Sequence, residues 1–205
     1  MAIGLQRNRE PLSPAEGTPV PEFNIFTTEG TPLPITSLWK EKPTLLIFGS
    51  ATCEYLAVSH PKLTALHQQF QDQIQFAMIY IREAHAADSG FPQPKVFAEV
   101  PDLPAPKNFS ERSYYAEQYE LIKNLPFPVY VDNINDTAAS IFSAWPIRYY
   151  VIATGGTVVY KGRIGPWGAR AMEKDSYDPV AMNPWVNATG RDESVEAFLK
   201  GYLKE

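Results

Sequence analysis

One transition in the sequence limits the possible folds of this chain more than any other. The apolar run TLLIF at residues 44–48 stops at Gly49, as expected of a short strand buried on both faces. Beyond Cys53 the apolar positions recur at intervals of mostly three or four, which predicts a helix with an interruption at Pro61. A buried strand that leads directly into a helix is typical of an α/β protein with a parallel sheet.

The rest of the chain continues this alternation. Strands are predicted near residues 23–26, at 74–81 and at 126–132, and a hairpin is predicted around Gly155 and Gly156. Helices are predicted from Ser110 and from Asp136, each of which is a suitable N-terminal cap, and at the C-terminus.

This order predicts an α/β, thioredoxin-like sandwich, in which a central mixed sheet is flanked by helices. Residues 1–16 are expected to form a flexible arm and residues 17–205 one domain. Within that domain, residues 91–125 are interpreted as an insertion that serves as a lid or a dimer surface. Pro146 is a candidate for the cis proline that many such folds hold opposite the reactive cysteine.

Composition excludes several classes of function. A formal net charge of -5 and a pI of about 5.3 argue against nucleic-acid binding. No stretch approaches the roughly 20 apolar residues of a membrane helix, and one cysteine cannot form an internal disulfide. A cytoplasmic location is therefore expected. The sequence shows no metal-ligand spacing and no phosphate-binding glycine loop, so neither a metal nor another cofactor is predicted.

Cys53, the single cysteine, is the first candidate for chemistry. At a helix N-terminus it would face unpaired N–H groups, which favour the thiolate, and Ser50 and Thr52 could donate further hydrogen bonds. We therefore expect a thiol pKa below the ordinary value, although Glu54 opposes this shift. Leu56 stands where a dithiol motif would place its second cysteine, so turnover would need an external thiol.

A second polar group follows the predicted strand at 74–81. Glu83 and His85 are two residues apart and would project to the same side of an extended segment. The carboxyl ends of parallel strands meet at one edge of a sheet, so both residues are expected near Cys53. There they could relay a proton.

Three segments, FGSATC, YIREAH and YYVIATGGTVVYKGRIGPWG, resemble the catalytic domain of the iodothyronine deiodinases. The resemblance covers roughly residues 17–175 and implies a thioredoxin fold with Cys53 in place of selenocysteine. It also implies catalytic roles for five further residues: Ser50, Thr52, Tyr80, Glu83 and His85. Arg148 would hold the amino-acid end of the substrate. The implied reaction is reductive removal of iodine from an aromatic ring, with an external thiol as reductant and a homodimer as the assembly.

The sequence also departs from the family pattern. Sulfur in place of selenium predicts slower chemistry, Ala51 replaces a neighbouring cysteine, and Pro106 or Lys107 stands where a substrate-binding histidine is expected. Two alternatives therefore remain open. One is a one-cysteine, peroxiredoxin-like thiol peroxidase, favoured by Ser50 three residues before Cys53 but not by Leu46, where such enzymes carry proline. The other is a non-catalytic binding module.

Overall fold

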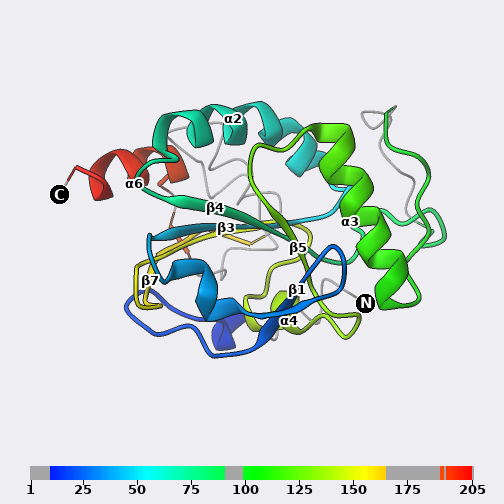
Figure 1. The fold of residues 1–205 in the computed structure, drawn as a ribbon, viewed down its shortest axis with the longest axis horizontal. Coiled ribbons are helices and arrows are strands. Elements are labelled where there is room, and N and C mark those ends of the chain that lie inside the picture. Colours follow the sequence, from blue (N-terminus) through cyan, green and yellow to red (C-terminus); the bar gives the residue numbers. More distant parts are fainter. Residues whose placement is uncertain (1–9, 91–98, 165–189, 192, 205) are drawn as a thin grey trace.

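The structure is a computed structural model that describes residues 10–90, 99–164, 190–191 and 193–204. The described part of the chain forms a mixed sheet with helices on both faces (Figure 1). In chain order the elements are η1 (Glu10–Leu12), β1 (Asn24–Thr27), β2 (Pro32–Pro34), η2 (Ile35–Trp39), β3 (Thr44–Gly49), α2 (Glu54–Phe70), β4 (Gln75–Tyr80), α3 (Phe109–Lys123), β5 (Val129–Val131), α4 (Thr137–Ile141), β6 (Arg148–Ile152), β7 (Val158–Lys161) and α6 (Val195–Tyr202), where η denotes a 3-10 helix.

The sheet order, β2-β1-β5-β4-β3-β6-β7, places β3 inside the sheet, between the middle strand β4 and β6. β3 runs parallel to β4 and antiparallel to β6, and its last residue, Gly49, is in register with Tyr80 at the end of β4. The two strands therefore end side by side, and the segments that follow them begin at the same edge. The predicted mixed α/β sandwich is confirmed.

β3 divides the hydrophobic core into two layers because its side chains alternate between faces. Leu45 and Ile47 pack with residues of α2, α3 and α6, whereas Leu46 and Phe48 pack with residues of η2 and α4. All six residues of β3 are buried, as its unbroken apolar run predicts. Cys53 belongs to the α2 layer.

Several predictions about helices need correction. α2 is continuous through Pro61, with Leu56 and Leu63 buried on either side of it. α3 begins two residues earlier than expected: Asn108 is the N-cap, and its side chain accepts a hydrogen bond from the N–H of Glu111 at 2.9 Å. An asparagine oxygen placed three residues before a free N–H makes a stronger cap than Ser110 inside the first turn.

Part of the segment interpreted as an insertion, residues 91–125, forms α3. This helix links the parallel strands β4 and β5, and it buries Tyr115, Ala116 and Tyr119 in the core. It is the crossover helix that a parallel strand pair requires. Residues 91–98 lie outside the described part of the chain, and a lid or dimer role for the segment stays a prediction.

α4 is capped by a different aspartate from the one predicted. Asp136 occupies the N-cap position but makes no capping hydrogen bond through its side chain. The buried carboxylate of Asp132 accepts hydrogen bonds from the N–H groups of Ala138 and Ala139, at 2.8 and 2.9 Å. Asp136 instead pairs with Arg112, at 2.8 Å.

Residues 10–16, the last part of the expected N-terminal arm, contact the domain through two glutamates. The carboxylate of Glu10 forms a bidentate ion pair with Arg148 in β6, with distances of 2.5 and 2.8 Å. Glu16 pairs with Arg191 at 2.7 Å. Pro146 is preceded by a cis peptide bond.

Replacing Glu10 by alanine is expected to destabilise the fold strongly. Arg148 is fully buried, so the variant would leave a buried charge without its counter-ion, which costs about 3–5 kcal/mol. Urea unfolding measures this loss, with Glu41→Ala on the exposed surface as the control. If Glu10→Ala had the same free energy of unfolding as the control variant, the ion pair between Glu10 and Arg148 would not be important for stability.

Asp132 predicts a pH dependence of stability. Burial raises the pKa of Asp132 to about 6, against the lowering effect of the two N–H groups of α4. Because the folded-state pKa lies above the unfolded one, the contribution is full below about pH 4 and is lost as the pH rises through about 6. The stability of the wild type relative to Asp132→Asn should fall by about 3 kcal/mol over that range.

Urea unfolding of both proteins between pH 4 and 7 checks this, with Asp72→Asn on the surface as the control. A difference between wild type and Asp132→Asn that does not change with pH would contradict the shifted pKa.

Candidate active site

Cys53 lies where the sequence predicted, at the N-cap of α2. Its backbone is extended, and its carbonyl accepts hydrogen bonds from the N–H groups of Leu56 and Ala57, both at 3.1 Å. The side chain is only 1% exposed, so this conformation shields the sulfur from solvent.

The expected decrease in the thiol pKa is wrong for this conformation. Burial raises the pKa of Cys53 to about 12, while the N–H groups of Leu56 and Tyr55 lower it and the charges of Glu54 and Glu83 raise it further. The helix N-terminus therefore acts in the predicted direction, but the loss of hydration outweighs it. Sequence reasoning placed the cysteine correctly and could not foresee how deeply it is buried.

Glu83 is the polar centre of the site. Its Oε2 atom accepts hydrogen bonds from the hydroxyl and the N–H of Thr52, at 2.6 and 3.1 Å, and its Oε1 atom accepts one from the hydroxyl of Tyr80, at 2.5 Å. The Tyr80 oxygen in turn accepts a hydrogen bond from the N–H of Ala51, at 3.1 Å. The segment after β4 thus binds the segment that carries Cys53.

Ser50 and His85 complete this connection through backbone groups. The hydroxyl oxygen of Ser50 accepts a hydrogen bond from the N–H of Ala84, and that of Thr52 accepts one from the N–H of His85, both at 3.1 Å. The Nδ1 atom of His85 is buried and has no hydrogen-bond partner within the described ranges. The structure therefore joins the side chains of Ser50, Thr52, Tyr80 and Glu83 next to Cys53, whereas His85 takes part through its backbone N–H. Glu83 and His85 follow β4 in an irregular segment and not in an extended one.

Burial also raises the pKa of Glu83, while the hydrogen bonds from Thr52 and Tyr80 lower it. The pKa of Tyr80 is raised by burial and by the neighbouring carboxylate. A buried carboxyl group with a raised pKa can hold a proton at a pH where an exposed one has lost it. Glu83 is thus suited to donate a proton.

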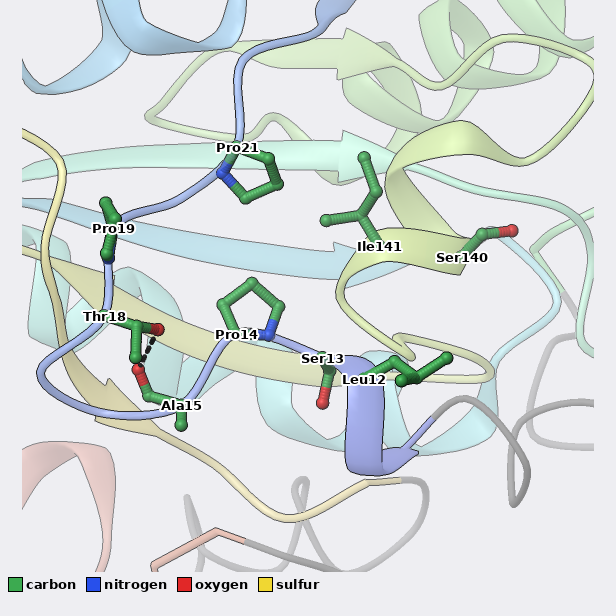
Figure 2. Close-up of a pocket in the computed structure, with 9 residues that line it drawn as sticks. All are labelled: Leu12, Ser13, Pro14, Ala15, Thr18, Pro19, Pro21, Ser140 and Ile141. Carbon is green, nitrogen blue, oxygen red and sulfur yellow. Dashed lines mark hydrogen bonds between the residues drawn. The ribbon is translucent and has the colours of Figure 1, made fainter.

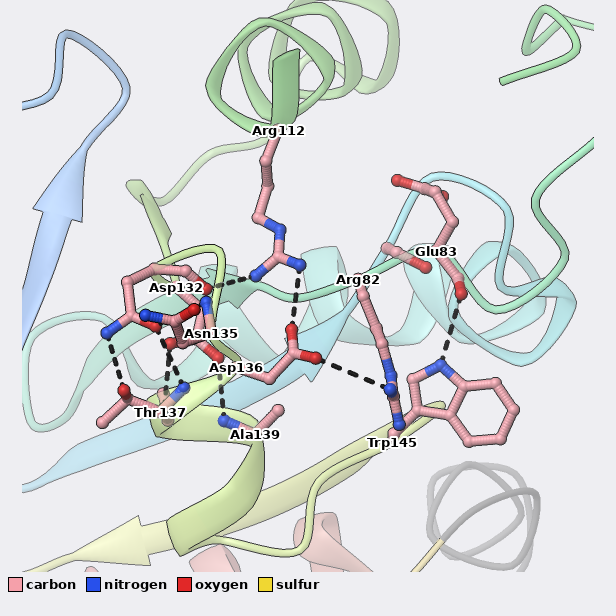
Figure 3. A network of polar contacts seen from close by, with 12 residues as sticks. Arg82, Glu83, Arg112, Asp132, Asn135, Asp136, Thr137, Ala139 and Trp145 are labelled. Carbon is pink, nitrogen blue, oxygen red and sulfur yellow. Dashed lines mark hydrogen bonds and ion pairs between the residues drawn. The ribbon is translucent and has the colours of Figure 1, made fainter. Parts of the chain in front are cut away.

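A second layer of contacts, which the sequence gave no reason to single out, supports Glu83 (Figure 3). The indole N–H of Trp145 donates a hydrogen bond to the Glu83 carbonyl at 3.3 Å, and Arg82 lies over the Trp145 ring, 5.4 Å from its centre. Asp136 joins Arg82, at 3.5 Å, to Arg112 of α3, at 2.8 Å. α3 and the segment before α4 are thereby linked to the Glu83 backbone.

Arg148 is not brought together with the other predicted site residues. Its side chain lies in the η2 and α4 layer, opposite Cys53, where it contacts the Tyr150 ring. Besides Glu10, it donates hydrogen bonds to the carbonyls of Gly162, Phe142 and Ser143, at 2.9, 3.0 and 3.2 Å. Its role in substrate binding stays a prediction. The segment from Gly165 to Gly168, part of the third motif, lies outside the described residues.

The surface hollow in Figure 2 is likewise separate from Cys53. It measures about 610 Å³ and is lined mainly by the prolines and small residues of segment 12–21, with Ser140 and Ile141 of α4. No side chain of the network around Glu83 takes part in it.

Within the described ranges, no three His, Cys, Asp or Glu side chains lie together as a metal site would need. None of the helices in those ranges is long and apolar enough to span a membrane.

Comparison with known structures supports the fold. The thioredoxin domain of a thiol-disulfide oxidoreductase from Bacteroides vulgatus superposes with a TM-score of 0.51 and 14% identity, covering 78% of this chain and 97% of that domain. The hypothetical protein SMc02350 from Sinorhizobium meliloti 1021 gives a TM-score of 0.52 and 13% identity, covering 73% of this chain and 71% of that one. At these identities the likeness concerns the fold alone.

Sequence comparison identifies the family. Type I iodothyronine deiodinase of Xenopus laevis is 31% identical over 133 residues, which is 64% of this chain and 50% of that protein. Human thyroxine 5-deiodinase is 26% identical over 161 residues, which is 77% of this chain and 51% of that protein. The chain thus spans about half the length of these relatives. Because the family model for iodothyronine deiodinase matches residues 13–177, the chain belongs to the iodothyronine deiodinase family.

Proposed function

We propose that this chain is a thiol-dependent oxidoreductase that removes iodine from an iodinated phenol or iodothyronine through Cys53. The observation that carries the proposal is the buried carboxyl group of Glu83. It accepts hydrogen bonds from Thr52, the residue before Cys53, and from Tyr80 at the end of β4. A nucleophile and a proton donor held by the same short segments are what this reaction needs. Membership of the iodothyronine deiodinase family supports removal of iodine as the reaction.

The reaction is balanced by two molecules of external thiol. The Cys53 thiolate attacks iodine, the carbon–iodine bond breaks, and its electron pair stays on the ring carbon, which takes a proton supplied through Glu83 and His85. The resulting sulfur–iodine bond is reduced by a first thiol, which releases iodide and leaves a mixed disulfide. A second thiol displaces Cys53 and leaves as the oxidised disulfide. No further cofactor enters this scheme.

Replacing Cys53 by serine is expected to abolish iodide release from an iodothyronine in excess dithiol. Glu83→Gln should lower the rate about 100-fold or more, since it removes the proton donor, and Glu41→Gln on the exposed surface is the control. Iodide in the medium is the quantity measured. Release by the serine variant equal to that of the wild type would exclude Cys53 as the nucleophile, and consumption of peroxide by the wild type would then be tested.

One observation favours a second candidate, a non-catalytic binding module. The thiol of Cys53 is buried and its pKa is raised to about 12, which disfavours the reactive thiolate. This candidate needs no proton donor, however, and gives no reason for a buried carboxyl group beside the cysteine.

Alkylation of Cys53 by iodoacetamide across pH is expected to have a midpoint above the ordinary thiol value of about 8.5, because burial disfavours the thiolate. Cys53 is the only cysteine in the chain, so mass spectrometry follows it without interference. Addition of an iodinated phenol should protect the thiol if the proposed function is correct. A midpoint below the ordinary value would show that the buried conformation is not the one that dominates in solution.

A further inference from the structure

Tyr119 is a buried polar residue beside the candidate site to which neither sequence nor family assigns a role. It projects from α3 into the same core layer as Cys53 and is 2% exposed. Its hydroxyl group is fully buried and has no hydrogen-bond partner in the ranges that the structure describes. A buried hydroxyl without a partner destabilises a fold by about 1–3 kcal/mol, so its presence needs an explanation.

The position of Tyr119 relates it to the reacting group. Its ring packs edge-on against Tyr80, with ring centres 6.2 Å apart, and the Tyr80 hydroxyl contacts both Glu83 and the N–H of Ala51. The ionisable groups that face Tyr119 come from four segments: Cys53 at the start of α2, Tyr149 in β6, Glu83 after β4 and Glu99 before α3. After burial, the charge that Cys53 would carry as a thiolate is the largest influence that raises the pKa of Tyr119.

We propose that Tyr119 is a further residue of the candidate active site, and that its hydroxyl group donates a hydrogen bond to the sulfur of Cys53 when the thiolate forms. The proposal rests on the proposed function, which requires that thiolate. Cys53 lacks a side-chain hydrogen bond at the N-cap position, and the described residues offer no acceptor to the Tyr119 hydroxyl. Thiolate formation would satisfy both groups at once, and a hydrogen bond to a charged group is stronger than one to a neutral group.

Tyr119 keeps its own proton in this scheme. Burial and the neighbouring ionisable groups raise the pKa of Tyr119, so the hydroxyl remains a donor near neutral pH. The thiol proton leaves to solvent, and no electron transfer involves the tyrosine. The residue therefore offsets part of the desolvation that makes the Cys53 thiolate unfavourable.

The test is Tyr119→Phe, compared with the wild type and with Tyr114→Phe on the exposed side of the same helix. The Tyr119 variant should react with iodoacetamide about tenfold more slowly at a fixed pH below the thiol pKa, as expected for loss of a hydrogen bond to a charged group. Its melting temperature should stay unchanged or rise, because in the thiol state the hydroxyl has no partner to lose among the described residues. The control should match the wild type in both measurements.

Three results would overturn the proposal. One is an alkylation rate equal to that of the wild type, and another is a melting temperature that falls together with the rate, which would indicate a structural role. The third is a change in the amide hydrogen-exchange rates of residues 50–53, between the variant and the wild type, by the same factor as the alkylation rate. Such a change would show that access to the sulfur had changed. Alkylation needs no iodinated substrate, so failure of this proposal is distinguishable from failure of iodide release by the wild type.

Discussion

The site depends on one buried carboxylate that ties two loops together. Glu83 receives hydrogen bonds from Thr52 and Tyr80, and these satisfy both oxygens of a group that would otherwise be expensive to bury. The segment before α2 and the segment after β4 cannot separate without breaking them. The parallel pairing of β3 and β4 places the two segments at one edge, and Glu83 fixes how they meet there.

The chemistry of Cys53 is a competition between two opposing effects of the same fold. The start of α2 supplies N–H groups that favour the thiolate, whereas the surrounding apolar layer removes the water that would stabilise it. Desolvation is the stronger effect in this conformation. A reactive form of the site therefore requires either entry of water or substrate, or donors that compensate for the lost hydration.

The sequence predicted the layered fold and most of the site because both depend on local patterns. The unbroken apolar run in β3, the change of period after Cys53 and the spacing of Glu83 behind β4 are all visible in the letters. What it could not predict depends on tertiary contacts. Asp132 caps α4 through the N–H of a residue six positions away, and Glu10 neutralises Arg148 from 138 positions away. Tyr119 is one of several buried residues on an amphipathic helix. Nothing in the local sequence distinguishes these residues from their neighbours.

The ion pair between Glu10 and Arg148 joins residues that are 138 positions apart, and this separation bears on the order of folding. Arg148 cannot meet its counter-ion until β6 is in the sheet, and closing so long a loop carries a large entropic penalty. Because distant contacts tend to form after local ones, we expect the central strands to assemble while the guanidinium group of Arg148 is still hydrated. We expect burial of that charge to be a late step, and detachment of the N-terminal segment to be among the first events of unfolding. A fusion partner attached ahead of Glu10 would act on the part of the molecule that we expect to dock last.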